Sequence, residues 1–158
     1  MEKGSRIYQN VSFTLPSRWR RSISDAERAI DLRVAVRVVK GQWPDPDDPK
    51  RDPSTSYLNL IDVLRGRATN VGVATHDASL ATEALKRLRA SETPCELEQL
   101  YGLPFLGLRV ANRLGVCVRV YVAYGTAWLP YCISQVGRRP IILAWLARDF
   151  LQGNPRVC

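Results

Sequence analysis

Hydrophobic and polar positions follow two alternating periods along this chain. Short apolar segments with the two-residue period of a strand, or a continuous apolar run, predict strands at 11–15, 32–39, 71–74, 95–100 and 116–122. Segments with apolar positions every three or four residues predict helices at 22–30, 57–64, 78–88, 105–114 and 127–136. A last apolar face covers 141–151.

Local signals mark where some of these elements begin. The helix at 22–30 has acidic residues in its first turn and either Ser22 or Ser24 as its predicted cap. The segment 44–53 is rich in proline and aspartate, so it is predicted to be a loop.

Strand and helix alternate about five times, which predicts right-handed strand–helix units on a parallel sheet. The length of 158 residues suits one domain, with 1–10 as an N-terminal extension. In such folds the ligand-binding side chains lie at the carboxyl ends of the strands. The polar residues that follow 32–39 and 71–74 are therefore the first candidates for a site.

Composition narrows the class of protein. With 46% hydrophobic and 24% charged residues the chain is typical of a globular protein. Its apolar runs are shorter than the ~20 residues of a membrane span. The first residues lack the apolar core of a secretory signal, which predicts a cytoplasmic location, with peripheral membrane association left open.

The net charge and the cysteine spacing argue against two further kinds of site, one for nucleic acid and one for a metal ion. The net charge of +8 permits a polyanionic partner, but the basic cluster 18–21 (RWRR) is short and has no second cluster, so we favour a solvated face over nucleic-acid binding. The four cysteines have no C-x-x-C spacing, and with one histidine they predict no metal site.

Four ordered motifs stand at the ends of predicted strands: VRVVKG at 36–41, ATHD at 74–77, ELEQLYG at 96–102 and VRVYVAYG at 118–125. In order and spacing they resemble successive strand ends of proline dehydrogenases. The resemblance covers about residues 11–151. It implies an incomplete (β/α)8 barrel made of about the last five strand–helix units, with FAD as the cofactor.

The resemblance also implies roles for single residues. Arg37 would face the reactive nitrogen of the flavin, with Lys40 and Gly41 beside the cofactor. A guanidinium at this place would stabilise the electron-rich reduced ring. Thr75 and His76 would hold the phosphate and ribose portion of FAD.

The resemblance implies further site residues in the predicted strands 95–100 and 116–122, and just after the predicted strand 32–39. Glu98 stands where the family carries glutamine, and a carboxylate cannot donate as an amide does. Arg119 would also bind the cofactor, and Tyr121 would line the substrate pocket, so that Arg37 and Tyr121 are the implied catalytic residues. Gln42 and Trp43 replace the usual Ala-Tyr and would border the substrate.

The last predicted helix departs from the family pattern. The family carries Tyr-x-x-Arg-Arg-Leu-x-Glu, whose arginines clamp the substrate carboxylate. Here Tyr131 is followed by Ser134 and Gln135 at the arginine positions, and Arg138 stands at the glutamate position, one helical turn along. All four are implied substrate-binding residues.

The residues taken without the family allow other interpretations. Arg37 could be a surface ion-pair partner, His76 a structural histidine, and Tyr121 a half-buried aromatic of a strand.

Two functions remain open at this point. The first is a flavoprotein that oxidises proline or a related secondary amine and passes electrons to a quinone. The second is a non-catalytic remnant or an assembly partner in a two-chain barrel, since the early strands of the family have no counterpart in this sequence.

Overall fold

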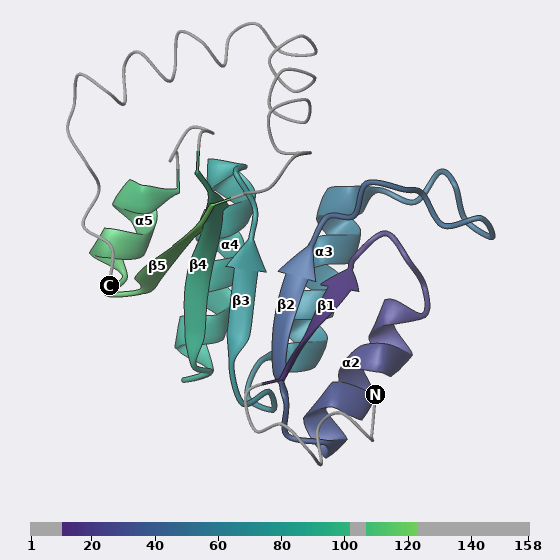
Figure 1. The fold of residues 1–158 in the computed structure, drawn as a ribbon, viewed down its shortest axis with the longest axis horizontal. Coiled ribbons are helices and arrows are strands. Elements are labelled where there is room, and N and C mark those ends of the chain that lie inside the picture. Colours follow the sequence, from purple (N-terminus) through teal and green to yellow (C-terminus); the bar gives the residue numbers. More distant parts are fainter. Residues whose placement is uncertain (1–10, 102–106, 123–158) are drawn as a thin grey trace, which may run out of the picture.

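A computed structural model describes residues 11–101 and 107–122. Within these two ranges, five parallel strands form one sheet in the order β1-β2-β3-β4-β5, and a helix follows each of the first four (Figure 1). The elements are β1 (Ser12–Pro16), α2 (Ser22–Asp31), β2 (Ala35–Val39), α3 (Pro53–Leu64), β3 (Val71–Ala74), α4 (Ala78–Ala90), β4 (Cys95–Leu100), α5 (Leu108–Arg113) and β5 (Cys117–Tyr121).

The strand order confirms the predicted fold class. Sequential parallel order means that the chain steps across the sheet in one direction, as in a barrel, with no reversal of the kind that marks a doubly wound sheet. The described residues thus form an open α/β sheet that is consistent with part of a (β/α)8 barrel. The predicted helix at 127–136 and the apolar face at 141–151 lie outside the described residues.

One face of the sheet carries the core. Helix α2 packs on β1 and β2, α3 on β2, α4 on β3 and β4, and α5 on β4 and β5, and consecutive helices pack on one another. Alternate strand residues are fully or almost fully buried beneath the helices, as expected for period-two segments with one apolar face; they include Leu15, Val36, Val38, Val71, Val73, Leu97 and Val118. The buried face of the helices supplies Tyr57, Leu60, Ile61, Leu64, Leu85 and Leu88.

The helix starts show which local predictions hold. At α2 the cap position is Arg21, without a side-chain cap. Ser22 Oγ instead donates to Pro16 O at 2.7 Å and Ser24 Oγ to Arg21 O at 2.8 Å, so the predicted serine cap was wrong. At α3 the pattern is a standard one, because Asp52 accepts from Thr55 N at 2.6 Å.

Strand β2 begins later than the sequence pattern predicts. Its first residue is Ala35, because the chain turns at Arg33, which has a positive φ of 52°. Residues 32–34 therefore belong to the turn after α2. The shorter strand still places Arg37 at its centre.

The proline-rich composition of 44–53 predicted a loop, and the structure has a loop there up to Asp52, with Pro53 beginning α3. This loop is folded onto the loop after β1. Asp45 is buried and accepts from Arg20 N at 2.7 Å and from Asp47 N at 3.0 Å. Trp19 Nε1 donates to Trp43 O at 3.2 Å. These bonds fix the segment that follows the strand end of β2.

Candidate active site

The face of the sheet opposite the helices is polar. The strand pairing sets Thr14, Arg37 and Gly72 side by side across β1, β2 and β3, and sets Glu98 beside Arg119 across β4 and β5. Side chains alternate along a strand, so the charged residues on this face alternate with the buried residues that point toward the helices. Polar groups in the middle of a sheet face are costly unless they are paired, which directs attention to their partners.

Arg37 and Glu98 form an ion pair on this face. The Nε group of Arg37 donates to Glu98 Oε2, and the two side chains are 25% and 10% exposed. Burial by itself lowers the pKa of Arg37, but the hydrogen bond and charge of Glu98 outweigh it, so the pKa lies above its ordinary value. The guanidinium is therefore fixed as a cation.

Tyr121 completes this cluster from β5. The guanidinium carbon of Arg37 lies 4.8 Å from the centre of the Tyr121 ring, a cation–π distance. Tyr121 is 41% exposed, so one part of the ring contacts Arg37 while another part faces solvent. The structure thus brings together the two residues that the resemblance implies to be catalytic, and Arg37 also contacts Glu98.

Arg119 makes a second, more exposed pair. Its Nε lies 3.0 Å from both carboxylate oxygens of Glu96, and this hydrogen bond is the main reason that the pKa of Arg119 is raised. The side chain of Arg119 is 64% exposed. The structure thus places Arg119 on the same face as Arg37 and pairs it with a carboxylate that the sequence had not singled out.

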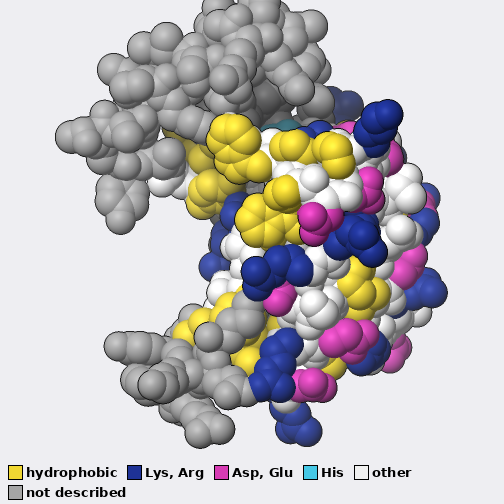
Figure 2. Space-filling model, turned by 90° about the vertical axis from the view of Figure 1, so that its right-hand side faces the viewer, with side chains coloured by type: hydrophobic (Ala, Val, Ile, Leu, Met, Phe, Trp, Pro, Cys, Tyr) yellow, Lys and Arg dark blue, Asp and Glu magenta, His cyan; other side chains and the backbone are white. Residues whose placement is uncertain are grey.

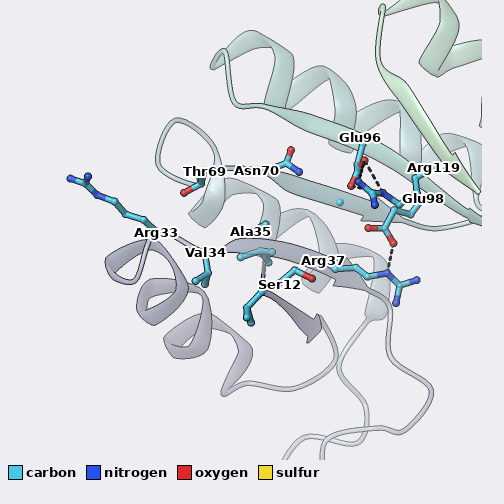
Figure 3. Close-up of a pocket in the computed structure, with 13 residues that line it drawn as sticks. Ser12, Arg33, Val34, Ala35, Arg37, Thr69, Asn70, Glu96, Glu98 and Arg119 are labelled. Atoms are coloured by element: carbon cyan, nitrogen blue, oxygen red, sulfur yellow. Dashed lines mark hydrogen bonds and ion pairs between the residues drawn. The ribbon is translucent and has the colours of Figure 1, made fainter. Parts of the chain in front are cut away.

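A hollow of about 650 Å³ extends from these pairs toward the amino ends of the strands (Figure 3). Its lining includes Ser12, Ala35, Asn70 and Gly72 together with the two ion pairs. Figure 3 shows the side chains of Arg37 and Glu98 pointing toward one another, and those of Arg119 and Glu96 likewise.

The carboxyl ends of β2 and β3 carry the second group of predicted residues. Lys40 Nζ lies 3.1 Å from Asp77 Oδ2. Thr75 is buried, and its Oγ1 accepts from Asp77 N at 3.2 Å. His76 Nε2 accepts from Leu100 N at 3.1 Å, which ties the end of β3 to the end of β4.

Asp77 is a residue of this edge to which the sequence analysis gave no role. Its Oδ1 accepts from Ser79 N and Leu80 N, both at 3.1 Å, so it caps α4. The bond from Leu80 N, then that from Ser79, and then Lys40 lower its pKa to about 2. An aspartate one position before an apolar helical pattern is the signal that could have identified it.

Gly41 has a structural reason for its identity. Its φ is +86°, a conformation that favours glycine, and a Cβ there would lie 3.0 Å from Pro16 Cβ. The small residue therefore allows the loop after β2 to pass close to the end of β1. Gln42 and Trp43 follow on this loop, both exposed, with Trp43 at 69%.

Large exposed hydrophobic side chains of the described residues gather at this same edge. They follow or end strands β1, β2, β4 and β5, and they are Trp19, Trp43, Tyr101, Tyr121 and Val122. Figure 2 shows hydrophobic side chains clustered near the end of the molecule toward which the strands point, with charged side chains below them. An apolar patch rimmed by polar groups is typical of a ligand or partner site.

Four predicted site residues lie outside the described residues, and two kinds of feature, a membrane-spanning helix and a metal-ligand cluster, are absent from the described ones. Tyr131, Ser134, Gln135 and Arg138 lie outside the described residues. In the ranges 11–101 and 107–122, no helix is long and apolar enough to cross a bilayer. Over those same ranges no three His, Cys, Asp or Glu side chains are grouped as a metal would require.

The described residues define a class of protein: an open α/β sheet, consistent with part of a (β/α) barrel, with charged and aromatic side chains on the face opposite the helices and at the carboxyl ends of its strands. Comparison with known proteins finds relatives that are proline dehydrogenases. The chain is 28% identical to proline dehydrogenase 1 of Bacillus subtilis (strain 168), over 84% of this chain and 46% of that protein. It is 29% identical to proline dehydrogenase of Deinococcus radiodurans, over 92% of this chain and 49% of that protein. Proline dehydrogenase 2 of B. subtilis (strain 168) is 26% identical over 87% of the chain.

These matches confirm the resemblance of this chain to proline dehydrogenases. The chain spans about half the length of the curated relatives it matches. No protein-family model matches it.

Proposed function

We propose that this chain is a proline-dehydrogenase-like flavoprotein that binds FAD on the inner face of its sheet. The observation that supports the proposal most is the Arg37–Tyr121 cluster, a fixed cation beside a half-exposed aromatic ring on the inner face of a partial barrel. The reaction we propose is oxidation of proline or a related secondary amine, with electrons passed to a quinone.

The residues at this site fit the ring system of a flavin. Arg37 carries terminal guanidinium donors that suit the acceptor atoms of such a ring, and the partly exposed ring of Tyr121 offers a stacking surface beside them. Gly72 on the neighbouring strand has no side chain, and the carboxylate of Glu98 lies over it, beside Arg37.

The strand ends fit the phosphate and ribose portion. The ammonium of Lys40, 37% exposed, would contact phosphate oxygens, and the hydroxyl of Thr75 has a hydrogen to donate. His76 Nε2 accepts from Leu100 N, which holds the imidazole ring at the same edge of the sheet. Gly41 lets the backbone of the loop lie close to these groups.

When bound, FAD would supply the capacity to accept a hydride, and the chain's own residues would bind and orient the reactants. Arg37 would hold the ring through charge-assisted hydrogen bonds, and Tyr121 would line the substrate pocket beside it. Arg119, two residues before Tyr121 on β5, would add positive charge to the same face.

The proposed substrate contacts differ from those that the resemblance implies for the family. Gln42, Trp43 and Tyr131 would border the pocket, as would the two neutral residues Ser134 and Gln135 in place of paired arginines. Arg138, four residues after Ser134 in the sequence, is the cation proposed to approach a substrate carboxylate. A neutral pair binds a carboxylate more weakly than a guanidinium fork, so we favour a related secondary amine over L-proline itself.

A second candidate function rests on the edges of the sheet. Among the described residues, β1 pairs with β2 alone and β5 with β4 alone, and unpaired strand edges are ready to add further strands. We propose as the alternative that the chain is a non-catalytic remnant or an assembly partner that completes a barrel with a second chain. A stable hetero-complex with no flavin bound would favour this alternative.

The test is a titration of the purified chain with FAD, followed by flavin fluorescence and visible absorbance. We expect saturable binding, and we expect Arg37→Ala to weaken it by roughly 10- to 100-fold, since hydrogen bonds to charged groups contribute about 1.5–3 kcal/mol. Arg89→Ala, an exposed arginine on α4, is the matched control and should bind like the wild type. A wild-type chain that remains colourless after incubation with FAD would contradict the proposal.

A further inference from the structure

The Arg37–Glu98 pair spans an intervening strand. Arg37 lies on β2 and Glu98 on β4, with β3 between them. Neighbouring strands are about 4.8 Å apart, so the two backbones are separated by roughly twice that distance. The side chains can meet only by passing over β3, on the face that they share.

Gly72 on β3 leaves room for the side chains of Arg37 and Glu98 to meet. It is the β3 residue in register with Arg37, and a Cβ built on it would lie 2.3 Å from Glu98 Oε1 and 3.1 Å from Glu98 Cδ. Every other residue type would place an atom where the carboxylate now lies. The contact between Glu98 and Arg37 therefore depends on the glycine between them.

The pair changes what Arg37 can offer to a ligand. Glu98 occupies the Nε edge of the guanidinium and Tyr121 lies against its face, so a ligand meets the terminal nitrogens. The carboxylate is 10% exposed, so little solvent screens its charge. An anionic group brought to Arg37 would be repelled by Glu98 at close range, whereas an uncharged acceptor would not.

We propose that Glu98, whose carboxylate occupies the space above Gly72, is a specificity-determining residue. It makes Arg37 select an uncharged hydrogen-bond acceptor over an anion. The inference rests on the proposed function in one respect: the acceptor it concerns is the ring of the flavin. For a bound flavin, Glu98 would disfavour the anionic reduced ring and so lower the reduction potential.

The first test needs no flavin. Inorganic sulfate is titrated into the ¹⁵N-labelled chain at constant ionic strength, and the Nε–Hε resonance of Arg37 is followed by NMR. Glu98→Gln keeps the size of the side chain and an acceptor oxygen while removing the charge. We expect sulfate to affect Arg37 in this variant with an affinity about tenfold or more above that of the wild type.

Two further variants sharpen the test. Glu96→Gln is the matched control, because it removes a carboxylate from the same strand and face but one that pairs with Arg119. It should change the response of Arg119 and leave that of Arg37 as in the wild type. Gly72→Ala displaces the Glu98 carboxylate without changing either charge, and it should also make Arg37 sensitive to sulfate.

Equal sulfate affinity at Arg37 in the wild type and in Glu98→Gln would overturn the inference, whether or not Gly72→Ala folds. In the second test, FAD is bound to both proteins and its potential is measured, with a higher potential expected for Glu98→Gln. If neither protein binds FAD, the proposed function fails, while the sulfate result still decides the role of Glu98.

Discussion

Asp77 offers the sharpest test of how the strand-end edge is held together. Its Oδ1 accepts hydrogen bonds from Ser79 N and Leu80 N at 3.1 Å and from Ser79 Oγ at 2.8 Å, while Oδ2 lies 3.1 Å from Lys40 Nζ. One side chain thus caps α4 and also joins the ends of β2 and β3. Removing it should cost stability for both reasons.

The expected magnitude follows from those contacts. Loss of a helix N-cap costs about 1 kcal/mol, and an ion pair as exposed as that with Lys40 contributes between about 0 and 1 kcal/mol. We expect Asp77→Ala to lower the free energy of unfolding by about 1–2 kcal/mol, a decrease in Tm of roughly 3–6 °C for a domain of this size. Asp77→Asn keeps a capping oxygen and should lose at most about 1 kcal/mol.

The effect of pH gives a second readout with a defined sign. The pKa of Asp77 falls from an ordinary 3.8 to about 2 in the folded chain, mainly through the bond from Leu80 N. A lowered carboxyl pKa means that the stabilisation is complete above about pH 4 and is lost as the pH falls toward 2. The stability difference between wild type and Asp77→Asn should therefore disappear over that window.

Urea unfolding followed by circular dichroism measures each of these differences. Asp31→Ala, an exposed carboxylate at the end of α2, is the control and should stay within about 0.5 kcal/mol of wild type. If Asp77→Ala unfolds at the wild-type midpoint, or if Asp77→Asn is as unstable as Asp77→Ala, the capping argument is refuted.

Three further predictions concern the core and the reaction. Tyr57→Phe should lower stability by about 0.5–1.5 kcal/mol in urea unfolding, because the buried hydroxyl donates to Val38 O at 3.0 Å; an unchanged midpoint would contradict this. Leu97→Ala should cost about 2–5 kcal/mol in the same assay, since Leu97 is fully buried between sheet and helices, and a loss under 1 kcal/mol would show that it is not a core residue. The purified chain with L-proline, FAD and a dye acceptor should show no turnover at ordinary enzyme rates, because Ser134 and Gln135 provide no guanidinium pair for the carboxylate; dye reduction at such rates would refute this.

The order and type of elements could be predicted from the sequence because the periods are unambiguous. The valine-rich strands, the helical spacing from Tyr57 to Leu64 and the proline-rich loop each follow from a local pattern that the tertiary structure preserves. The start of α2 could not be predicted, because the hydrogen-bond partner of Ser22 comes from another part of the fold. Its hydroxyl bonds to Pro16 O in the tertiary structure and so does not cap its own helix.

The sequence supplied Arg37, Glu98 and Tyr121 as candidates, but it could not supply their contacts or the roles of Glu96 and Asp77. That Arg37 and Tyr121 share a face follows only from the register of β2 to β5, and a slip of one residue would place one of them among the helices. The pairing of Arg37 with Glu98 depends further on a glycine in the strand between them. The interpretation of Arg37 as an ion-pair partner therefore also holds, and it is compatible with a role in the site.

The cations of this site are each matched by a carboxylate from another strand or its end. The pairs are Arg37 with Glu98, Lys40 with Asp77, and Arg119 with Glu96. An anionic ligand would therefore have to displace these carboxylates from their cations. Its net binding free energy would be the difference between the new ion pair and the ion pair that it replaces. Uncharged parts of a ligand have no such competitor, since the exposed rings of Tyr121 and Trp43 are open to stacking. Affinity for a cofactor that carries both phosphates and a neutral ring should thus come mainly from the ring, and riboflavin, which lacks the phosphates, should retain most of the binding free energy of FAD.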